Sequence, residues 1–242
     1  MQKDHAETSQ VKAWDFPTRA FHWLLVIGIV SGWVSYRYAE ALGDPQMKWH
    51  RYNGYAVIIL IVFRLLWGIF GSHTARWRTF VKSPVSALNY GLSLARRQAT
   101  PHYLGHNPLG TYMVLALLLV VTVQATTGLF VVEHNDTTWG PLYKLVSEET
   151  RNAIRYVHQN MYFVVLLPLI GMHVLANILY SVIKKDPLIR AMIVGTKPAN
   201  DYVDAPASPA PWRGIGVALP LILAAIMTVF GTITVMGGKL FY

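Results

Sequence analysis

Five long apolar stretches limit what this chain can fold into. Each is close to the roughly 20 mostly apolar residues that one α-helix needs to cross a lipid bilayer. The strands of a membrane barrel would be shorter and would alternate in polarity. The sequence therefore predicts an all-α integral membrane protein, with a four-helix transmembrane bundle and a fifth transmembrane helix near the C-terminus. The stretches are residues 21–38, 52–70, 109–132, 161–183 and 215–236.

The composition supports this class of protein. Of the 242 residues, 53% are hydrophobic and only 14% are charged, whereas a soluble domain carries about 25% charged residues. The absence of cysteine excludes disulfides, thiolate-bound metal clusters and covalently attached c-type haem. The net charge of +9 comes from basic residues between the apolar stretches, without a nucleic-acid-binding motif. We therefore expect the lipid bilayer as a partner and do not expect nucleic acid.

The distribution of lysine and arginine predicts the orientation in the membrane. Residues 1–20, 71–105 and 184–213 share one side of the bundle and hold 13 of the 21 basic residues. The side richer in basic residues faces the cytoplasm, so we expect the N-terminus inside and the C-terminus outside. The first stretch begins too far from Met1, and lacks the cleavage site, to be a removed signal peptide.

A segment rich in proline and alanine, residues 198–213, separates the fifth stretch from the others. Such a composition is typical of an extended linker. We therefore expect a four-helix core at residues 1–197, a cytoplasmic linker, and an additional transmembrane helix within residues 214–242. This last helix has no histidine and no ionisable residue in its apolar part, so we expect it to anchor the protein or to bind a partner.

Four histidines lie within or beside the apolar stretches, where ionisable side chains are costly and are therefore functional candidates. His22 lies near the cytoplasmic end of the first stretch, and His50 lies just before the second, near the outer face. His158 precedes the fourth stretch at the outer face, and His173 lies 15 residues further along. This spacing is roughly 22 Å along a helix, with the two side chains within roughly 60° of each other. His22 and His173 thus share the inner level, and His50 and His158 share the outer level.

Each pair comes from two different helices and can clamp a flat ligand from both faces. Without cysteine, and with two imidazoles per site, we infer two b-type haems with non-covalent, bis-histidine ligation. A six-coordinate iron has no open position, so such haems transfer electrons and do not bind oxygen. Two other interpretations remain open: the histidines are hydrogen-bonded packing residues, or they line a path for metal ions or protons.

Four arginines lie near these levels and are candidate partners of the haem propionates. Three of them lie within three residues of one of the four histidines, and the other interrupts the second apolar stretch at the inner level. The alternative is ordinary extension of arginine side chains to the membrane surface. The four are Arg19, Arg51, Arg64 and Arg155.

The remaining histidines have no partner at the same depth, and we expect them to be exposed or to lie behind the ligands. They are His5, His73, His102, His106 and His134. Several glycines in the apolar stretches either let a macrocycle approach the backbone or allow close helix packing. They are Gly28, Gly32, Gly54 and Gly128.

Six strings are distinctive along residues 11–198. They are WDFPTRAFHW (14–23), WHRYNGY (49–55), FRLLWGIFGSHTAR (63–76), YLGHNPLG (103–110), QATTGLF (124–130) and RAMIVGTKP (190–198). Together they resemble the bacterial cytochrome b561 family, in the branch that includes the b-type cytochrome subunit of nickel–iron hydrogenases. The resemblance implies a four-helix core in the bacterial cytoplasmic membrane with two b haems. It implies the same four histidine ligands: His22, His50, His158 and His173.

The expected function is electron transfer across the membrane. The electrons would pass between a quinone pool and a periplasmic redox partner, either a c-type cytochrome or a hydrogenase-like enzyme. Three alternatives remain open at this point. The chain is a superoxide:quinone oxidoreductase, purely the membrane anchor subunit of a larger oxidoreductase, or a histidine-lined transporter of metal ions or protons.

Overall fold

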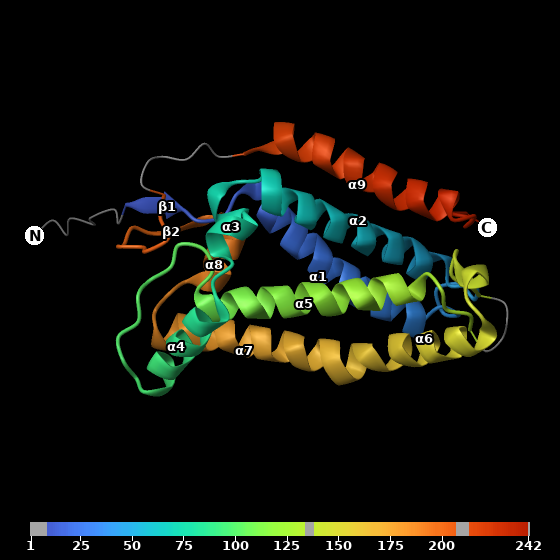
Figure 1. Ribbon diagram of the computed structural model, residues 1–242, viewed down its shortest axis with the longest axis horizontal. Helices are drawn as coiled ribbons and strands as arrows, with labels where there is room; N and C mark the ends of the chain where they lie inside the picture. Colours follow the sequence, from blue (N-terminus) through green and yellow to red (C-terminus); the bar gives the residue numbers. More distant parts are fainter. Residues whose placement is uncertain (1–8, 134–137, 207–212, 242) are drawn as a thin grey trace, which may run out of the picture.

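Long helices that run side by side form most of the molecule (Figure 1). The structure is a computed structural model and describes residues 9–133, 138–206 and 213–241. α2 occupies the centre, because α1, α5 and α9 all pack against it, and α5 also packs against the longest helix. The long helices are α1 (Phe16–Arg37), α2 (Lys48–Phe70), α5 (Pro108–Gly128), α9 (Ile215–Val235) and a continuous helix made of α6 (Glu148–Met161), η3 (Tyr162–Leu166) and α7 (Leu167–Ile183).

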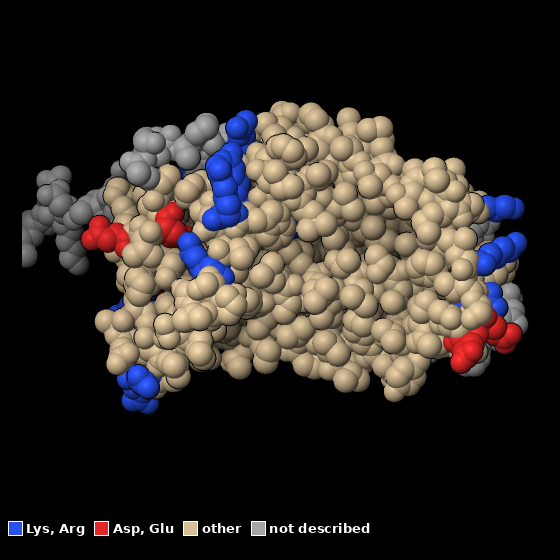
Figure 2. All heavy atoms as spheres, in the orientation of Figure 1, with Lys and Arg blue, Asp and Glu red and all other residues tan. Residues whose placement is uncertain are grey.

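Among the helices of the described residues, four are long and apolar enough to cross a membrane: α2, α5, α9 and the continuous helix from α6 to α7. Figure 2 shows a broad middle band without charged side chains, with lysine, arginine and acidic residues towards the two ends. The chain is therefore a multi-pass membrane protein. α1 is not one of the four, although its 22 residues run along α2 (Figure 1). The membrane crossing by α1 thus stays a prediction.

A buried hydrogen-bond network joins the start of α1 to the end of α2. Asp15 caps α1, since its Oδ1 accepts a hydrogen bond from the Thr18 backbone N–H at 2.7 Å, and Pro17 occupies the first turn. The indole N–H of Trp67 donates to Asp15 Oδ2 at 3.2 Å and to Thr18 Oγ1 at 3.1 Å. Trp67 is fully buried, so these bonds fix the start of α1 against α2.

Close contact between α1 and α2 continues further along the two helices. Asn53 Nδ2 donates to the Gly28 carbonyl at 2.9 Å, and Ser31 Oγ donates to Asn53 Oδ1 at 2.8 Å. A Cβ atom on Gly28 would lie 2.9 Å from the side chain of Val57. A larger residue at this position would therefore push the two helices apart.

Short elements gather at the end of the bundle where α1 begins (Figure 1). β1 pairs antiparallel with β2, with Gln10 opposite Pro198; the apolar pattern did not predict this small sheet. Lys197 in β2 is fully buried and forms an ion pair with Asp186 at 2.9 Å. We call these elements the cap. They are β1 (Gln10–Lys12), η1 (His73–Ala75), α3 (Trp77–Phe80), α4 (Pro84–Ala95), α8 (Leu188–Val194) and β2 (Thr196–Pro198).

The first part of the predicted linker lies against the cap. The Asp204 carboxylate accepts hydrogen bonds from the backbone N–H groups of Leu104 at 2.6 Å and Gly105 at 2.9 Å. The Val203 N–H donates to the His102 carbonyl at 3.1 Å. The linker residues 207–212 lie outside the described residues. The described part is thus tied to the loop before α5.

The continuous helix from α6 to α7 is longer than the sequence pattern predicted. It begins at Glu148, not at residue 161, and Ser147 Oγ caps it by accepting the Thr150 N–H at 3.3 Å. The pattern missed this part because residues 148–160 are polar enough to interrupt the apolar stretch. Its 36 residues span about 54 Å, more than the roughly 30 Å of the hydrocarbon layer. One end therefore extends out of the membrane.

Asp15→Ala is expected to lower the free energy of unfolding by about 1–3 kcal/mol, because it removes a helix cap and an acceptor of the buried Trp67 indole. Thermal unfolding in detergent, followed by circular dichroism, measures the effect. Asp201→Ala is the control, since Asp201 is exposed. Equal unfolding midpoints in the two variants would contradict the role given to Asp15.

Candidate functional site

The outer pair of histidines is brought together between α2 and α6. The ring centroids of His50 and His158 lie 6.2 Å apart, with the rings nearly perpendicular at 89°. His50 Nδ1 lies 2.8 Å from the Gly32 carbonyl, and His158 Nδ1 lies 2.9 Å from the Gln124 carbonyl. A carbonyl only accepts, so each Nδ1 is the N–H donor and each Nε2 keeps its lone pair. The two rings are thus prepared to coordinate a metal through Nε2.

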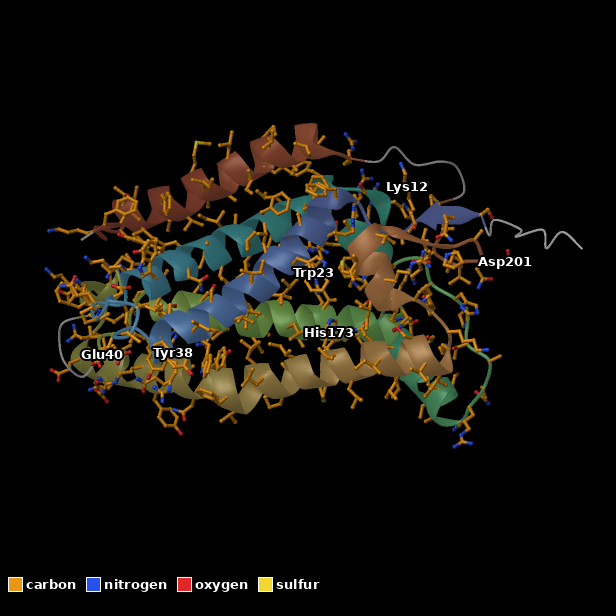
Figure 3. All side chains as sticks on the ribbon, turned by 180° about the vertical axis from the view of Figure 1, so that it is seen from behind. Lys12, Trp23, Tyr38, Glu40, His173 and Asp201 are labelled. Atoms are coloured by element: carbon orange, nitrogen blue, oxygen red, sulfur yellow. The ribbon has the colours of Figure 1, made fainter. Side chains whose placement is uncertain are left out.

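The inner pair is brought together between α1 and α7. The ring centroids of His22 and His173 lie 6.5 Å apart, with the rings tilted by 46°. Figure 3 shows His173 and Trp23 in the region between these two helices. Trp23 meets His22 edge to face at 5.0 Å and donates its indole N–H to the Met192 carbonyl at 3.2 Å. The inner pair therefore lies at the end of the bundle that carries the cap.

A large cavity surrounds the outer pair. It encloses about 1270 Å³, its open mouth included, and is lined mainly by apolar side chains together with His50 and His158. Gly54 also lines it, and a Cβ atom there would meet nothing within 4 Å. A Cβ atom on Gly128 would lie 3.0 Å from His158 Cε1. Glycines thus keep space free beside the ring.

The two imidazoles of each histidine pair fit a metal ion that is held in a macrocycle. A metal about 2 Å from one nitrogen of each imidazole leaves the ring centroids roughly 6 Å apart, and both pairs have this separation. No group of three or more histidine, cysteine or acidic residues that could hold a metal ion occurs among the described residues. A metal ion held by two imidazoles would then take its other ligands from a bound group. A non-covalently bound haem meets this requirement, since the chain has no cysteine.

Three of the four predicted arginines interact with the backbone. Arg19 donates to the Ile193 carbonyl and so ties α1 to α8. Arg51 lines the outer cavity and donates to the Trp139 carbonyl at 3.4 Å. Arg155 donates to the Val132 carbonyl at 3.3 Å. Of these three, only Arg51 lines the cavity of the outer pair.

Arg64 is buried near the inner pair. It is 3% exposed, and its guanidinium lies 4.4 Å from the ring centroid of Trp77 and 5.5 Å from that of Phe80. Its Nη1 is buried without a hydrogen-bond partner among the described residues. A buried cation with an unpaired donor is costly. This atom is therefore suited to an anionic group of a ligand.

His106 lies close to Arg64. From the sequence it was expected to be exposed or to lie behind the ligands, and not to be a ligand itself. Its ring packs 4.8 Å from Trp14 and 4.7 Å from Phe80, and its Nδ1 is buried without a hydrogen-bond partner among the described residues. Burial, followed by the charge of Arg64, lowers the pKa of His106 from 6.5 to about 3. His106 is thus neutral at physiological pH. In the sequence it stands in the string YLGHNPLG, directly before Asn107, which caps α5.

The other histidines differ from the two pairs. His73 Nε2 lies 3.2 Å from the Asp204 carbonyl, and His102 is exposed. His5 and His134 lie outside the described residues. None of the described members of this group faces a second histidine ring at the distance found in the two pairs.

Comparison with known proteins identifies the family. A family model described as prokaryotic cytochrome b561 matches residues 13–195. The chain belongs to the prokaryotic cytochrome b561 family. A search of curated proteins found no match. Membership identifies a membrane-bound, haem-containing b-type cytochrome that takes part in electron transport.

The match to the cytochrome family covers α1 through α8 and ends before β2. It therefore includes both histidine pairs, Arg64 and His106. α9 lies outside the match, although it packs along α2 of the cytochrome. The family match therefore covers both histidine pairs and does not extend to α9.

Gly128→Leu in this cytochrome is expected to displace the His158 imidazole, because even a Cβ atom would lie within 3.0 Å of its Cε1. The variant should therefore bind less haem per protein than the wild type. Gly231→Leu in α9 is the control, since a Cβ atom there meets open space. Absorbance of the reduced haem against protein concentration measures the ratio, and full haem content in Gly128→Leu would contradict the role of this glycine.

Proposed function

We propose that this cytochrome carries electrons across the cytoplasmic membrane between a quinone pool and a periplasmic redox protein. The observation that carries the proposal is the pair of two-imidazole sites, near opposite ends of the bundle and each built from two helices. One site alone would serve one face of the membrane, whereas two sites form a path through it.

The outer haem would be held by His50 and His158, and the inner haem by His22 and His173. Bound haem would supply one-electron redox chemistry, and with two imidazoles holding each iron no position would be left open for oxygen. The protein orients the outer imidazoles through the Nδ1 hydrogen bonds to backbone carbonyls.

The haem carboxylates need cationic or hydrogen-bonding partners. For the outer haem we propose Arg51, which lines its cavity. For the inner haem we propose Arg64 together with His106, because Arg64 Nη1 and His106 Nδ1 are buried and have no hydrogen-bond partner in the part of the chain that the structure describes. Arg19 and Arg155 are secondary candidates, because each donates to a backbone carbonyl and neither lines the outer cavity.

The proposed orientation follows the basic residues. The cap and the loop before α5 gather at one end of the bundle (Figure 1), and the basic-rich segments lie there. We place this end in the cytoplasm. The outer haem then faces the periplasmic redox partner, and a quinone meets one haem edge from the lipid.

Double variants test the pairing of the ligands. His50→Ala with His158→Ala should leave one haem per chain, because both changes affect the same site. The crossed double variant, His22→Ala with His158→Ala, should leave none. A haem assay on purified protein distinguishes the two results, and His102→Ala is a control that should keep both haems. One haem in the crossed variant would contradict the proposed pairs.

Transmembrane electron transfer is measured in sealed vesicles that contain the protein. Ferricyanide is trapped inside, and a membrane-impermeant reductant is added outside. The wild type should reduce the trapped ferricyanide, whereas His158→Ala and His173→Ala should both fail, since each breaks the path at one site. Transfer by a single-haem variant at the wild-type rate would contradict the two-site path. Adding quinol or superoxide in place of the reductant identifies the donor.

Arg64→Gln is expected to lower the reduction potential of the inner haem by on the order of tens of millivolts. Removing a nearby positive charge favours the oxidised iron, which carries one more positive charge. The outer haem should shift less, because Arg64 lies near the other end of α2. Redox titration resolves the two potentials. Arg213→Gln, an exposed arginine at the same end, should leave both unchanged, and an equal shift of both haems by Arg64→Gln would contradict the assignment.

A further inference from the structure

The helix that carries His158 and His173 is interrupted between them by the η3 turn. There the Leu167 N–H donates to the Tyr162 carbonyl, five residues earlier, and not to the carbonyl four residues earlier. This is π-helical geometry, and one such turn takes up an additional residue relative to an α-helix. The interruption therefore changes the register between the two histidines.

Pro168 gives this turn a chemical cause. Proline has no N–H, and in an α-helix its ring clashes with the carbonyl four residues earlier, here that of Val164. Kinks and π-turns are the usual response of a helix to such a clash. Pro168 is the second residue of α7 and follows the turn almost directly. The turn lies where the proline requires a departure from α-helical bonding.

The turn also lies between the two haem sites. Tyr162 and Phe163 line the outer cavity. Leu166 is 1% exposed and packs in a cluster with Val57 of α2 and Val121 of α5. The turn is thus in contact with the bundle core. Because it lies between His158 and His173, a change of register in it rotates one imidazole relative to the other.

One additional residue rotates everything beyond it by about 100° around the helix axis. His158 must meet His50 of α2, whereas His173 must meet His22 of α1. An uninterrupted α-helix would offset the two by about 60°, and the additional residue changes this to about 40° in the opposite sense. We infer that Pro168 and the η3 turn set this offset, so that one helix supplies an imidazole to two different partner helices. Pro168 is then a positioning residue, an inference that rests on the proposed two-haem function.

Pro168→Ala tests the inference in the full chain. Without the clash the helix is expected to continue as an α-helix, and its two imidazoles cannot both face their partners. The purified variant should hold one haem where the wild type holds two, and redox titration should show one potential in place of two. Pro220→Ala, at the proline inside α9, is the matched control and should keep both haems. Two haems at wild-type potentials in Pro168→Ala would overturn the inference.

A second variant separates register from folding. Deleting Val165 in the Pro168→Ala background removes the additional residue and restores the wild-type offset along a continuous α-helix. This variant should hold two haems again, even where Pro168→Ala alone does not accumulate. Fewer than two haems would overturn the inference. The deletion can compensate for the loss of Pro168 only if Pro168 acts by setting the register between His158 and His173. Wild-type protein with fewer than two haems would instead contradict the proposed function on which the inference rests.

Discussion

The structure depends on imidazole rings that meet across helices at two levels of one bundle. At the outer level the rings are held in place because the Nδ1 atoms of His50 and His158 donate hydrogen bonds to backbone carbonyls of neighbouring helices. The ring centroids lie 6.2 Å apart, a separation that suits one metal ion between the two imidazoles. Helix packing serves this arrangement: Trp67 bonds to Asp15, and Asn53 bonds to the Gly28 carbonyl, so α1 and α2 keep a fixed relation.

The inner level is organised differently, because it lies beside the cap and contains buried charge. Lys197 has its counter-ion in Asp186, whereas the Nη1 of Arg64 has no partner among the described residues. A buried cation with one unpaired donor atom is costly, and an anionic group of a ligand would relieve this cost by accepting from Nη1. The neutral His106 beside it adds a hydrogen-bonding group without adding charge. The two histidine pairs thus differ in electrostatic surroundings.

The sequence predicted the pairing of the histidines in space because helical rise alone sets the depth of each residue. Their role as haem ligands stays a prediction, which membership of the cytochrome family supports. Other features depend on contacts that no spacing reveals. The position of His106 depends on the packing of its ring against Trp14 and Phe80. The β1–β2 pairing joins residues that are far apart in the chain. The η3 turn was readable in principle, since Pro168 stands inside the apolar stretch.

The most direct measurement is the haem content and spin state of the purified wild-type protein. Two b-type haems per chain are predicted, both with the low-spin electron paramagnetic resonance signals of bis-histidine iron in the oxidised state. A single haem, or a high-spin signal from an iron with an open position, would contradict the assignment of two imidazole pairs to two haems.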